Sequence, residues 1–320
     1  MVKFNAHLFS RLGESAAVFG LSLPSLKQND DTICAISADM SVVAGLDRFK
    51  NQYPDSFFNV GIAEQNMLGM AAGLVSEGFR SIAVAQACFI SMRSFEQMRQ
   101  YMGYMEFPII CIGINSGLAL TYFGNTHYAI EDLALTQAIP HLAVLSPADA
   151  GAAVELFELA LHMSKPTYIR LSGGMNCPIV YSEKPKVKIG GYNVLRFGKH
   201  VTLIATGTMV AIALQVGDLL SVKGIEAKVI DAYCIKPLDV SIIDECKNCA
   251  LIVSLEEHNV VGGLGSTIAN LLAEVQFSPR FVKLGIQDTF LTVGDYMYLL
   301  EQAGLTPEQI SKTILQELEK

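Results

Sequence analysis

Residues 57–79, FFNVGIAEQNMLGMAAGLVSEGF, decide how the chain is interpreted. Apolar residues at helical spacing, closed by Gly78, predict a helix that begins near residue 63. From Phe57 to Ser76 the only formally charged residue is Glu64, and no cation lies near it in the sequence. We expect this carboxylate to be buried. It could complement the dipole at the first turn of the helix, or its environment could be tuned for chemistry.

The composition indicates a globular chain with a substantial core. Its 320 residues, 51% of them hydrophobic, suit one or two domains. No stretch has the roughly 20 consecutive apolar residues that a membrane span needs. The N-terminal MVKFNAHLFSRLGES also lacks the apolar core of a signal peptide.

Charge and cysteine content narrow the partners and the compartment. A net charge of −8 without a basic run argues against nucleic acids and anionic membranes as partners. The seven cysteines are an odd number and lie mostly in apolar runs, which is typical of reduced, buried thiols. We therefore expect a cytoplasmic protein.

Strand-like and helix-like segments alternate along most of the chain. Short, apolar, partly β-branched runs predict strands at, for example, 31–39 and 80–87, with helical patterns between them. A segment rich in charges and glycines, 181–200, interrupts the alternation, which then restarts. The predicted fold class is α/β with two tandem domains, residues 1–183 and 184–320. Each domain is expected to be a mostly parallel sheet with helices on both faces.

Candidate site residues follow the predicted strands of the first domain. Ligands of open parallel sheets bind beyond the carboxyl ends of the strands. Asp39 follows the first strand, Glu64 begins a helix, and His127 lies in the loop FGNTH. The segment after the strand at 80–87 adds three side chains at helical spacing, Phe89, Met92 and Phe95. Such spacing is more typical of core packing than of a cofactor site, and a loop histidine can be merely solvated.

Three further motifs favour structural interpretations. GGLGS, residues 262–266, lacks the full glycine spacing of a nucleotide-binding loop. Cys246 and Cys249 form a lone CxxC without a second pair or a nearby histidine. LEEHN, residues 255–259, is expected to follow a strand and to form a loop network or a subunit contact.

The stretch 57–79 resembles the signature of the pyrimidine-binding domain of thiamine-diphosphate enzymes of the transketolase family. Five further segments resemble successive parts of that family: CFISMRSFEQ, FGNTH, DAYCIKPLD, ALIVSLEEHNVVGGLGS and LGIQDTF. The likeness covers nearly the whole chain. It implies a pyrimidine-binding domain followed by a transketolase C-terminal domain.

One family motif is missing. Full-length members carry, ahead of this region, a domain whose Gly-Asp-Gly motif and a downstream Asn hold a divalent metal on the cofactor's diphosphate. No Gly-Asp-Gly occurs in these 320 residues. The resemblance therefore implies the C-terminal half of a split transketolase. A separate subunit would supply the diphosphate site and hold Mg²⁺, in an α2β2 assembly in which this chain dimerises, and no metal ligand is expected here.

The resemblance assigns roles to the residues around the cofactor. Glu64 would hydrogen-bond a ring nitrogen of the aminopyrimidine, because a carboxyl group in an apolar site can share a proton with it. That would favour the imino tautomer, whose nitrogen removes the thiazolium proton; the carbanion chemistry is the cofactor's own. Glu64 would then lack a protein counter-charge because its partner is the ligand. Phe89, Met92 and Phe95 would sandwich the aminopyrimidine ring. The expected cofactor-binding residues are Glu64, Ile62, Phe89, Met92, Phe95 and Asp39.

The substrate residues match the family less closely. His127 corresponds to a histidine that contacts oxygens of the donor sugar and can move a proton near pH 7. Arg11 corresponds loosely to an arginine that grips a substrate phosphate. Where transketolases have an Asp, a His and an Arg for the sugar and its phosphate, this chain has Phe123, Asn115 and Gly173. The loss of two cations implies an unphosphorylated or modified sugar, or another 2-oxo donor.

The function implied is transfer of a two-carbon ketol unit from a ketose to an aldehyde, in carbohydrate metabolism. A second enzymatic hypothesis is decarboxylation of a 2-oxo acid, as in deoxyxylulose-phosphate synthases or the β subunits of 2-oxo acid dehydrogenases. A third is a non-catalytic interaction subunit, although the presence of both Glu64 and His127 argues against it.

Overall fold

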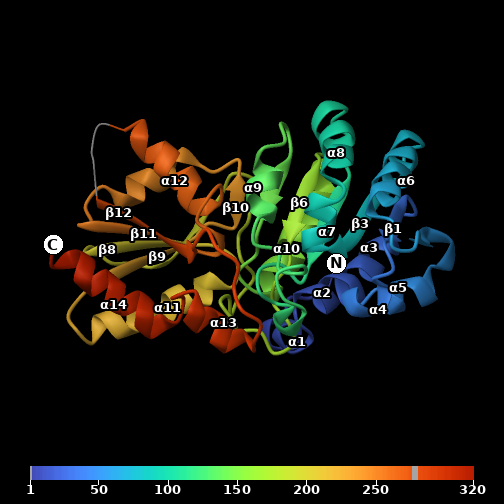
Figure 1. Ribbon diagram of the computed structural model, residues 1–320. Coiled ribbons are helices and arrows are strands. Elements are labelled where there is room, and N and C mark those ends of the chain that lie inside the picture. Colours follow the sequence, from blue (N-terminus) through green and yellow to red (C-terminus); the bar gives the residue numbers. More distant parts are fainter. Residues whose placement is uncertain (1, 276–279) are drawn as a thin grey trace.

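The computed structural model describes residues 2–275 and 280–320, and it confirms the predicted α/β class with two mostly parallel sheets (Figure 1). The first sheet has seven strands in the order β10-β5-β6-β4-β3-β1-β2. Its strands are β1 (Ile33–Ser37), β2 (Phe57–Asn59), β3 (Arg80–Gln86), β4 (Ile110–Ile114), β5 (Ala143–Leu145), β6 (Thr167–Arg170) and β10 (Cys234–Lys236). All neighbours are parallel except β10 and β5.

The strands of the first sheet are buried because helices cover both of its faces. Every residue of β1 and β4 is buried, which explains their nearly continuous apolar sequences. The α-helices that accompany this sheet are α1 (Ala6–Leu12), α2 (Glu14–Ala17), α3 (Leu23–Lys27), α4 (Ser41–Ala44), α5 (Asp47–Gln52), α6 (Glu64–Ser76), α7 (Ala87–Met92), α8 (Phe95–Gln97), α9 (Asp132–Gln137) and α10 (Ala150–Met163).

The N-terminal helix differs from its prediction. The apolar pattern predicts one helix over 5–26, ended by Pro24, but the chain forms α1, α2, a π-helical turn and α3 in succession. Gly13 has φ +80°, a conformation that ends α1 and that residues with a Cβ rarely adopt. Pro24 lies in the first turn of α3, where its missing N–H costs nothing.

The second sheet has five strands in the order β12-β11-β8-β9-β7, and only β7 runs antiparallel to its neighbour. Its strands are β7 (Asn193–Arg196), β8 (Val201–Ala205), β9 (Ala227–Asp231), β11 (Leu251–Asn259) and β12 (Arg280–Ile286). Its helices are α11 (Met209–Ser221), α12 (Leu264–Ala273), α13 (Tyr296–Gln302) and α14 (Pro307–Leu318). The boundary after residue 183 stays a prediction, because β10, which comes later in the chain, joins the first sheet.

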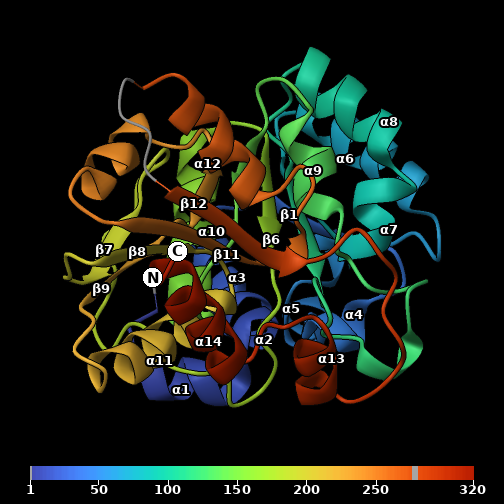
Figure 2. The same ribbon diagram turned by 60° about the vertical axis from the view of Figure 1, so that its left-hand side comes forward.

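A buried polar network joins the two sheets. The Arg170 side chain at the end of β6 is 1% exposed, and its Nε lies 3.0 Å from Oδ2 of Asp132. Tyr168 donates to the same oxygen, and Nη2 of Arg170 donates to the backbone carbonyl of Glu257 in β11. A buried ion pair holds only when its remaining donors and acceptors are also satisfied. Figure 2 shows β11 reaching the first domain beside α9.

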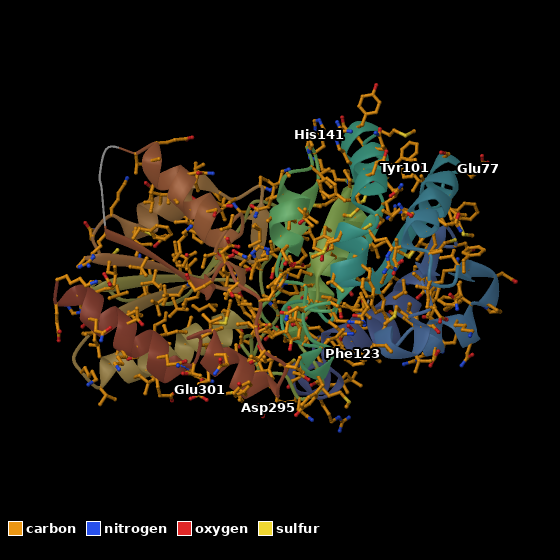
Figure 3. The ribbon with its side chains drawn as sticks, in the orientation of Figure 1. Glu77, Tyr101, Phe123, His141, Asp295 and Glu301 are labelled. Atoms are coloured by element: carbon orange, nitrogen blue, oxygen red, sulfur yellow. The ribbon has the colours of Figure 1, made fainter. Side chains whose placement is uncertain are left out.

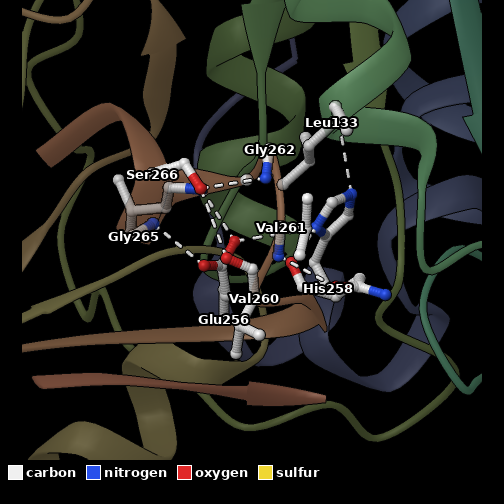
Figure 4. Close-up of polar contacts among 12 residues, drawn as sticks. Leu133, Glu256, His258, Val260, Val261, Gly262, Gly265 and Ser266 are labelled. Atoms are coloured by element: carbon white, nitrogen blue, oxygen red, sulfur yellow. Dashed lines mark hydrogen bonds and ion pairs between the residues drawn. The ribbon is translucent and has the colours of Figure 1, made fainter. Parts of the chain in front are cut away.

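The motif LEEHN lies inside β11, so the prediction that it follows a strand is wrong. The carboxylate of Glu256 accepts hydrogen bonds from the backbone N–H groups of Leu264 and Gly265, at the start of α12 (Figure 4). Nε2 of His258 accepts the backbone N–H of Ala134, from the first domain. These contacts support a structural role in joining the domains.

Within the described residues, no helix is both long enough and apolar enough to cross a membrane.

Asp231, at the end of β9, is the most strongly perturbed carboxyl group near the domain junction. Its side chain is fully buried, and Oδ2 accepts a hydrogen bond of 2.6 Å from the Tyr181 hydroxyl. Oδ1 has no hydrogen-bond partner among residues 2–275 and 280–320. Burial raises the pKa of Asp231 to about 8, against the lowering effect of the Tyr181 hydrogen bond. The Asp231 carboxyl group therefore keeps its proton to a higher pH in the folded chain than in the unfolded chain.

Asp231 should make the stability of the fold fall as pH rises. Between the ordinary pKa of 3.8 and the folded value of about 8, the unfolded chain binds one proton fewer at this group. The free energy of unfolding of the wild type should therefore fall more steeply with pH than that of Asp231→Asn, by about 1.4 kcal/mol per pH unit. Urea denaturation at several pH values measures this difference. Asp218→Asn, at an exposed position of α11, is the control; equal slopes for the wild type and Asp231→Asn would contradict the account.

Candidate active site

The candidate residues gather at the carboxyl ends of the first sheet's strands, where ligands of parallel sheets bind. Asp39 follows β1, Glu64 opens α6 after β2, Phe89 lies in α7 after β3, and Asn115 follows β4. In Figure 3, Phe123 lies on the lower side of the first domain. Glu77 and Tyr101, at the far ends of the neighbouring helices, lie at the opposite, upper side.

Glu64 is buried at the first turn of α6, as expected, but it has a protein counter-charge. The residue is 2% exposed, and its Oε2 accepts a hydrogen bond of 2.7 Å from Nη1 of Arg93. The expectation that Glu64 lacks a counter-charge is therefore wrong. Arg93 lies 29 residues away in sequence and reaches Glu64 because the helices that follow β2 and β3 begin at the same edge of the sheet.

The second oxygen of Glu64 is open. Within the described residues no hydrogen bond to Oε1 is formed, whereas Oε2 is held by Arg93. The Arg93 side chain is 43% exposed, so water still reaches the guanidinium. One oxygen of the carboxylate is thus without a hydrogen-bond partner among the described residues, while the other is held by Arg93.

A cluster of rings lies next to this ion pair. The guanidinium carbon of Arg93 is 4.4 Å from the centroid of the Phe89 ring, a cation–π contact. The other neighbour of Phe89 is His127, whose ring is 5.2 Å away in an edge-to-face arrangement. The centroid of the Phe123 ring lies 5.0 Å from that of the His127 ring. These contacts form a continuous row of four side chains: Glu64, Arg93, Phe89 and His127. Glu64 and His127, the two residues predicted to be catalytic, lie at its ends.

The remaining predicted cofactor residues vary in exposure. Ile62 is 76% exposed in the loop before α6, and Met92 at the end of α7 is 43% exposed. Phe95 is partly buried and packs against the core beneath. Exposed apolar side chains beside a buried carboxylate suit a ligand with a flat apolar face.

Asp39 is positioned by Asn59, at the end of the neighbouring strand. The Asn59 amide donates to Oδ1 of Asp39, and its carbonyl oxygen accepts the backbone N–H of Asp39, both at 3.1 Å. The same oxygen accepts the N–H of Gly61. Asp39 itself has φ +59°, an uncommon conformation for a residue with a side chain, and such residues often lie at functional sites. Asn59 thus links the Asp39 loop to the loop that leads into Glu64, and the sequence motifs did not identify it.

The predicted substrate residues are only partly brought together. Asn115, also with a positive φ of +53°, donates to the side chain of Gln86 at the end of β3. Arg11 is exposed in the last turn of α1, and within the described residues no hydrogen bond or ion pair joins it to the row of Glu64 and His127. The structure therefore supplies no contact that supports a shared role for Arg11.

Gly173 lies against an acid that sequence reasoning missed. A Cβ added to Gly173 would stand 2.6 Å from Oε1 of Glu14, so the Glu14 carboxyl group fills the space that a side chain would need. Oε2 of Glu14 accepts the backbone N–H of Ser172 at 2.7 Å. Burial raises the pKa of Glu14 to about 7. Where the resemblance implies a cation, this chain has an acid beside a glycine.

The residues present fit an aromatic heterocycle with a hydrogen-bonding ring nitrogen. They offer a buried carboxylate with one open oxygen, exposed apolar side chains beside it and a histidine at the far end of the row. In the described part of the chain, no three His, Cys, Asp or Glu side chains are placed to hold a metal ion.

Comparison with known proteins places the whole chain in one family. Residues 14–176 match the family model described as "Transketolase, pyrimidine binding domain", and residues 190–310 match "Transketolase, C-terminal domain". The chain is 32% identical to the putative transketolase C-terminal section of Methanocaldococcus jannaschii, over 94% of this chain and 95% of that protein. It is also 32% identical to a subunit of the apulose-4-phosphate transketolase of Phocaeicola vulgatus, over 93% of this chain and 96% of the relative.

A solved structure agrees with the sequence relatives. The structure described as "Split gene transketolase, inactive beta4 tetramer" is 35% identical, with a TM-score of 0.86 over 95% of this chain and 98% of that one. Other relatives are 1-deoxy-D-xylulose-5-phosphate synthases, and of those the chain spans about half the length.

Glu64 should be dispensable for folding. Glu64→Gln keeps the shape of the side chain, and water can replace the lost charge at Arg93, so the free energy of unfolding should change by less than about 1 kcal/mol. Asp132→Asn, which leaves Arg170 unpaired in the core, should cost about 3 kcal/mol or more. Urea denaturation measures both variants. A loss for Glu64→Gln as large as that for Asp132→Asn would show that Glu64 is a structural residue.

Proposed function

Because this chain belongs to the transketolase family, as a pyrimidine-binding domain followed by a C-terminal domain, we propose that it is one subunit of a heteromeric transketolase. The enzyme transfers a two-carbon ketol unit from a ketose to an aldehyde with thiamine diphosphate. The observation that carries the proposal is the open oxygen of a buried Glu64, at one end of a row that leads through Phe89 to His127.

The partner is a separate chain that carries the diphosphate and metal site. Two observations support this: a relative is named as one subunit of a transketolase, and a structural neighbour comes from a split gene. The partner holds Mg²⁺ on the diphosphate, and two copies of each chain form an α2β2 assembly in the cytoplasm.

When bound, thiamine diphosphate supplies the carbanion chemistry of ketol transfer. Oε1 of Glu64 would form the hydrogen bond to a ring nitrogen of the aminopyrimidine. Phe89 and Met92 would offer apolar and polarizable surfaces to the ring, and Ile62 and Asp39 would border it. A ring nitrogen of His127 hydrogen-bonds the oxygens of the donor sugar and can move a proton there. Nδ1 of His127 lies 2.9 Å from the Thr126 hydroxyl, which fixes the ring orientation.

The substrate is a sugar without a terminal phosphate, or one modified at that end. Phe123 places an apolar ring beside His127 where an Asp would read a hydroxyl group. Glu14 stands against Gly173, and neither residue offers a positive charge to a phosphate. Asn115 stands where transketolases have a histidine, and its side chain is a neutral amide.

Decarboxylation of a 2-oxo acid is the alternative. It is favoured by the relatives named 1-deoxy-D-xylulose-5-phosphate synthase, which are 33% identical over the part that matches. Release of carbon dioxide from pyruvate by the assembled enzyme would favour this alternative over ketol transfer.

Reconstitution tests the proposed activity. This chain mixed with the product of an adjacent gene that encodes a Gly-Asp-Gly motif, thiamine diphosphate and Mg²⁺ should form a ketose from an aldehyde acceptor. Glu64→Gln should lower turnover by at least about a hundredfold, the usual contribution of a positioned proton-transfer group. Glu77→Gln, at the far end of α6, is the matched control and should leave turnover unchanged. Failure of the mixture on every ketose donor would contradict the proposal.

The donor panel tests the substrate class. Unphosphorylated and modified ketoses should give higher kcat/KM than their terminal phosphates, because no cation compensates the phosphate charge near Gly173. A preference for the phosphates of about tenfold or more would show that another residue, of this chain or its partner, binds the phosphate.

A further inference from the structure

We propose that Arg93 is a positioning residue that fixes the carboxylate of Glu64, so that its open oxygen meets the ring nitrogen of the cofactor. This inference rests on the proposed function, because it needs a heteroaromatic ligand at Oε1.

The contact with Arg93 selects one oxygen of Glu64. A guanidinium group only donates hydrogen bonds, so the oxygen 2.7 Å from Nη1 is committed as an acceptor. Glu64 has no other side-chain partner in the described residues, and without Arg93 its carboxylate could rotate about the last side-chain bond. With Arg93 in place, only Oε1 is left for a ligand, and its direction is set.

Arg93 is itself held both at its backbone and at its guanidinium group. Its backbone N–H donates to the carbonyl of Phe89 at 2.9 Å, at the end of α7. The carbon of its guanidinium group lies over the ring of the same residue, 4.4 Å from the centroid, in a cation–π contact. The ring of Phe89 therefore fixes the guanidinium on one side, and Glu64 fixes it on another.

Stability alone does not account for this arrangement. With 43% of the Arg93 side chain exposed, water partly screens the ion pair, so the contribution of the pair to the stability of the fold is reduced. A carboxylate that is oriented before the ligand arrives binds the ligand more tightly, because no side-chain entropy is then lost on binding. The Arg93 contact is therefore expected to affect ligand affinity more than the stability of the fold.

The test compares two ligands that differ in one atom. Thiamine diphosphate can bond to Glu64 through its ring nitrogen, whereas an analogue with a C–H group in place of that nitrogen cannot. In the assembled complex with the partner chain and Mg²⁺, Arg93→Met should weaken binding of thiamine diphosphate about tenfold and binding of the analogue less than twofold. Arg93→Lys, which keeps the charge but loses the guanidinium group that lies over Phe89, should fall between. Isothermal titration calorimetry gives each Kd.

Two controls separate positioning from structure. Arg99→Met removes an exposed arginine of the next helical segment and should not change either Kd. In the background of Glu64→Gln, Arg93→Met should have less effect on the Kd of thiamine diphosphate than it has in the wild type, since its effect acts through the carboxylate.

The outcomes separate this inference from the proposed function. If the wild-type complex binds thiamine diphosphate but Arg93→Met weakens both ligands equally, or neither, Arg93 is not a positioning residue and the proposed function stands. If the wild-type complex does not bind thiamine diphosphate, the proposed function fails, and this inference fails with it.

Discussion

The site depends on one constraint: a buried carboxylate in which one oxygen is held by a guanidinium and the other is left open. Glu64 can occupy this position because α6 begins where the strands of the first sheet end, so its side chain points to the edge at which ligands bind. Burial without any partner would be costly for an ionised group. The ion pair with Arg93 offsets part of this cost, although the Arg93 side chain stays in contact with water. The pair leaves Oε1 without a partner. The rings of Phe89 and His127 continue the same edge, so the acid and the histidine are placed by one set of contacts.

The second domain is bonded to the first domain, which carries the site. The Asp132–Arg170 pair is sealed in the core and bonds to β11 through a backbone carbonyl, while β10 is added to the first sheet from beyond the predicted boundary. Breaking such contacts costs more than breaking an exposed ion pair, because each partner would stay buried without compensation. The two domains therefore share part of their cores, and a motion of one against the other would disturb the loops that carry the site.

The sequence was sufficient for some features and insufficient for others. The α/β class and the burial of Glu64 at a helix start follow from local patterns, because strand and helix periods differ and the charge stands alone among apolar residues. The Glu64–Arg93 contact could not be predicted, since it joins two helices that the parallel sheet brings together. The break at Gly13 depends on a backbone conformation that the apolar pattern does not reveal. Glu14 was overlooked because it lies against Gly173 only in the folded chain, while LEEHN was misplaced because buried polar groups inside a strand resemble a loop in sequence.

The most direct measurement of the central claim is a crystal structure of this chain with its partner chain, Mg²⁺ and thiamine diphosphate. The account predicts that Oε1 of Glu64 lies about 2.6–3.2 Å from a ring nitrogen of the aminopyrimidine, the range of a functional hydrogen bond, with Phe89 or Met92 against the ring. An aminopyrimidine bound away from Glu64, with Oε1 facing water or another protein side chain, would contradict it.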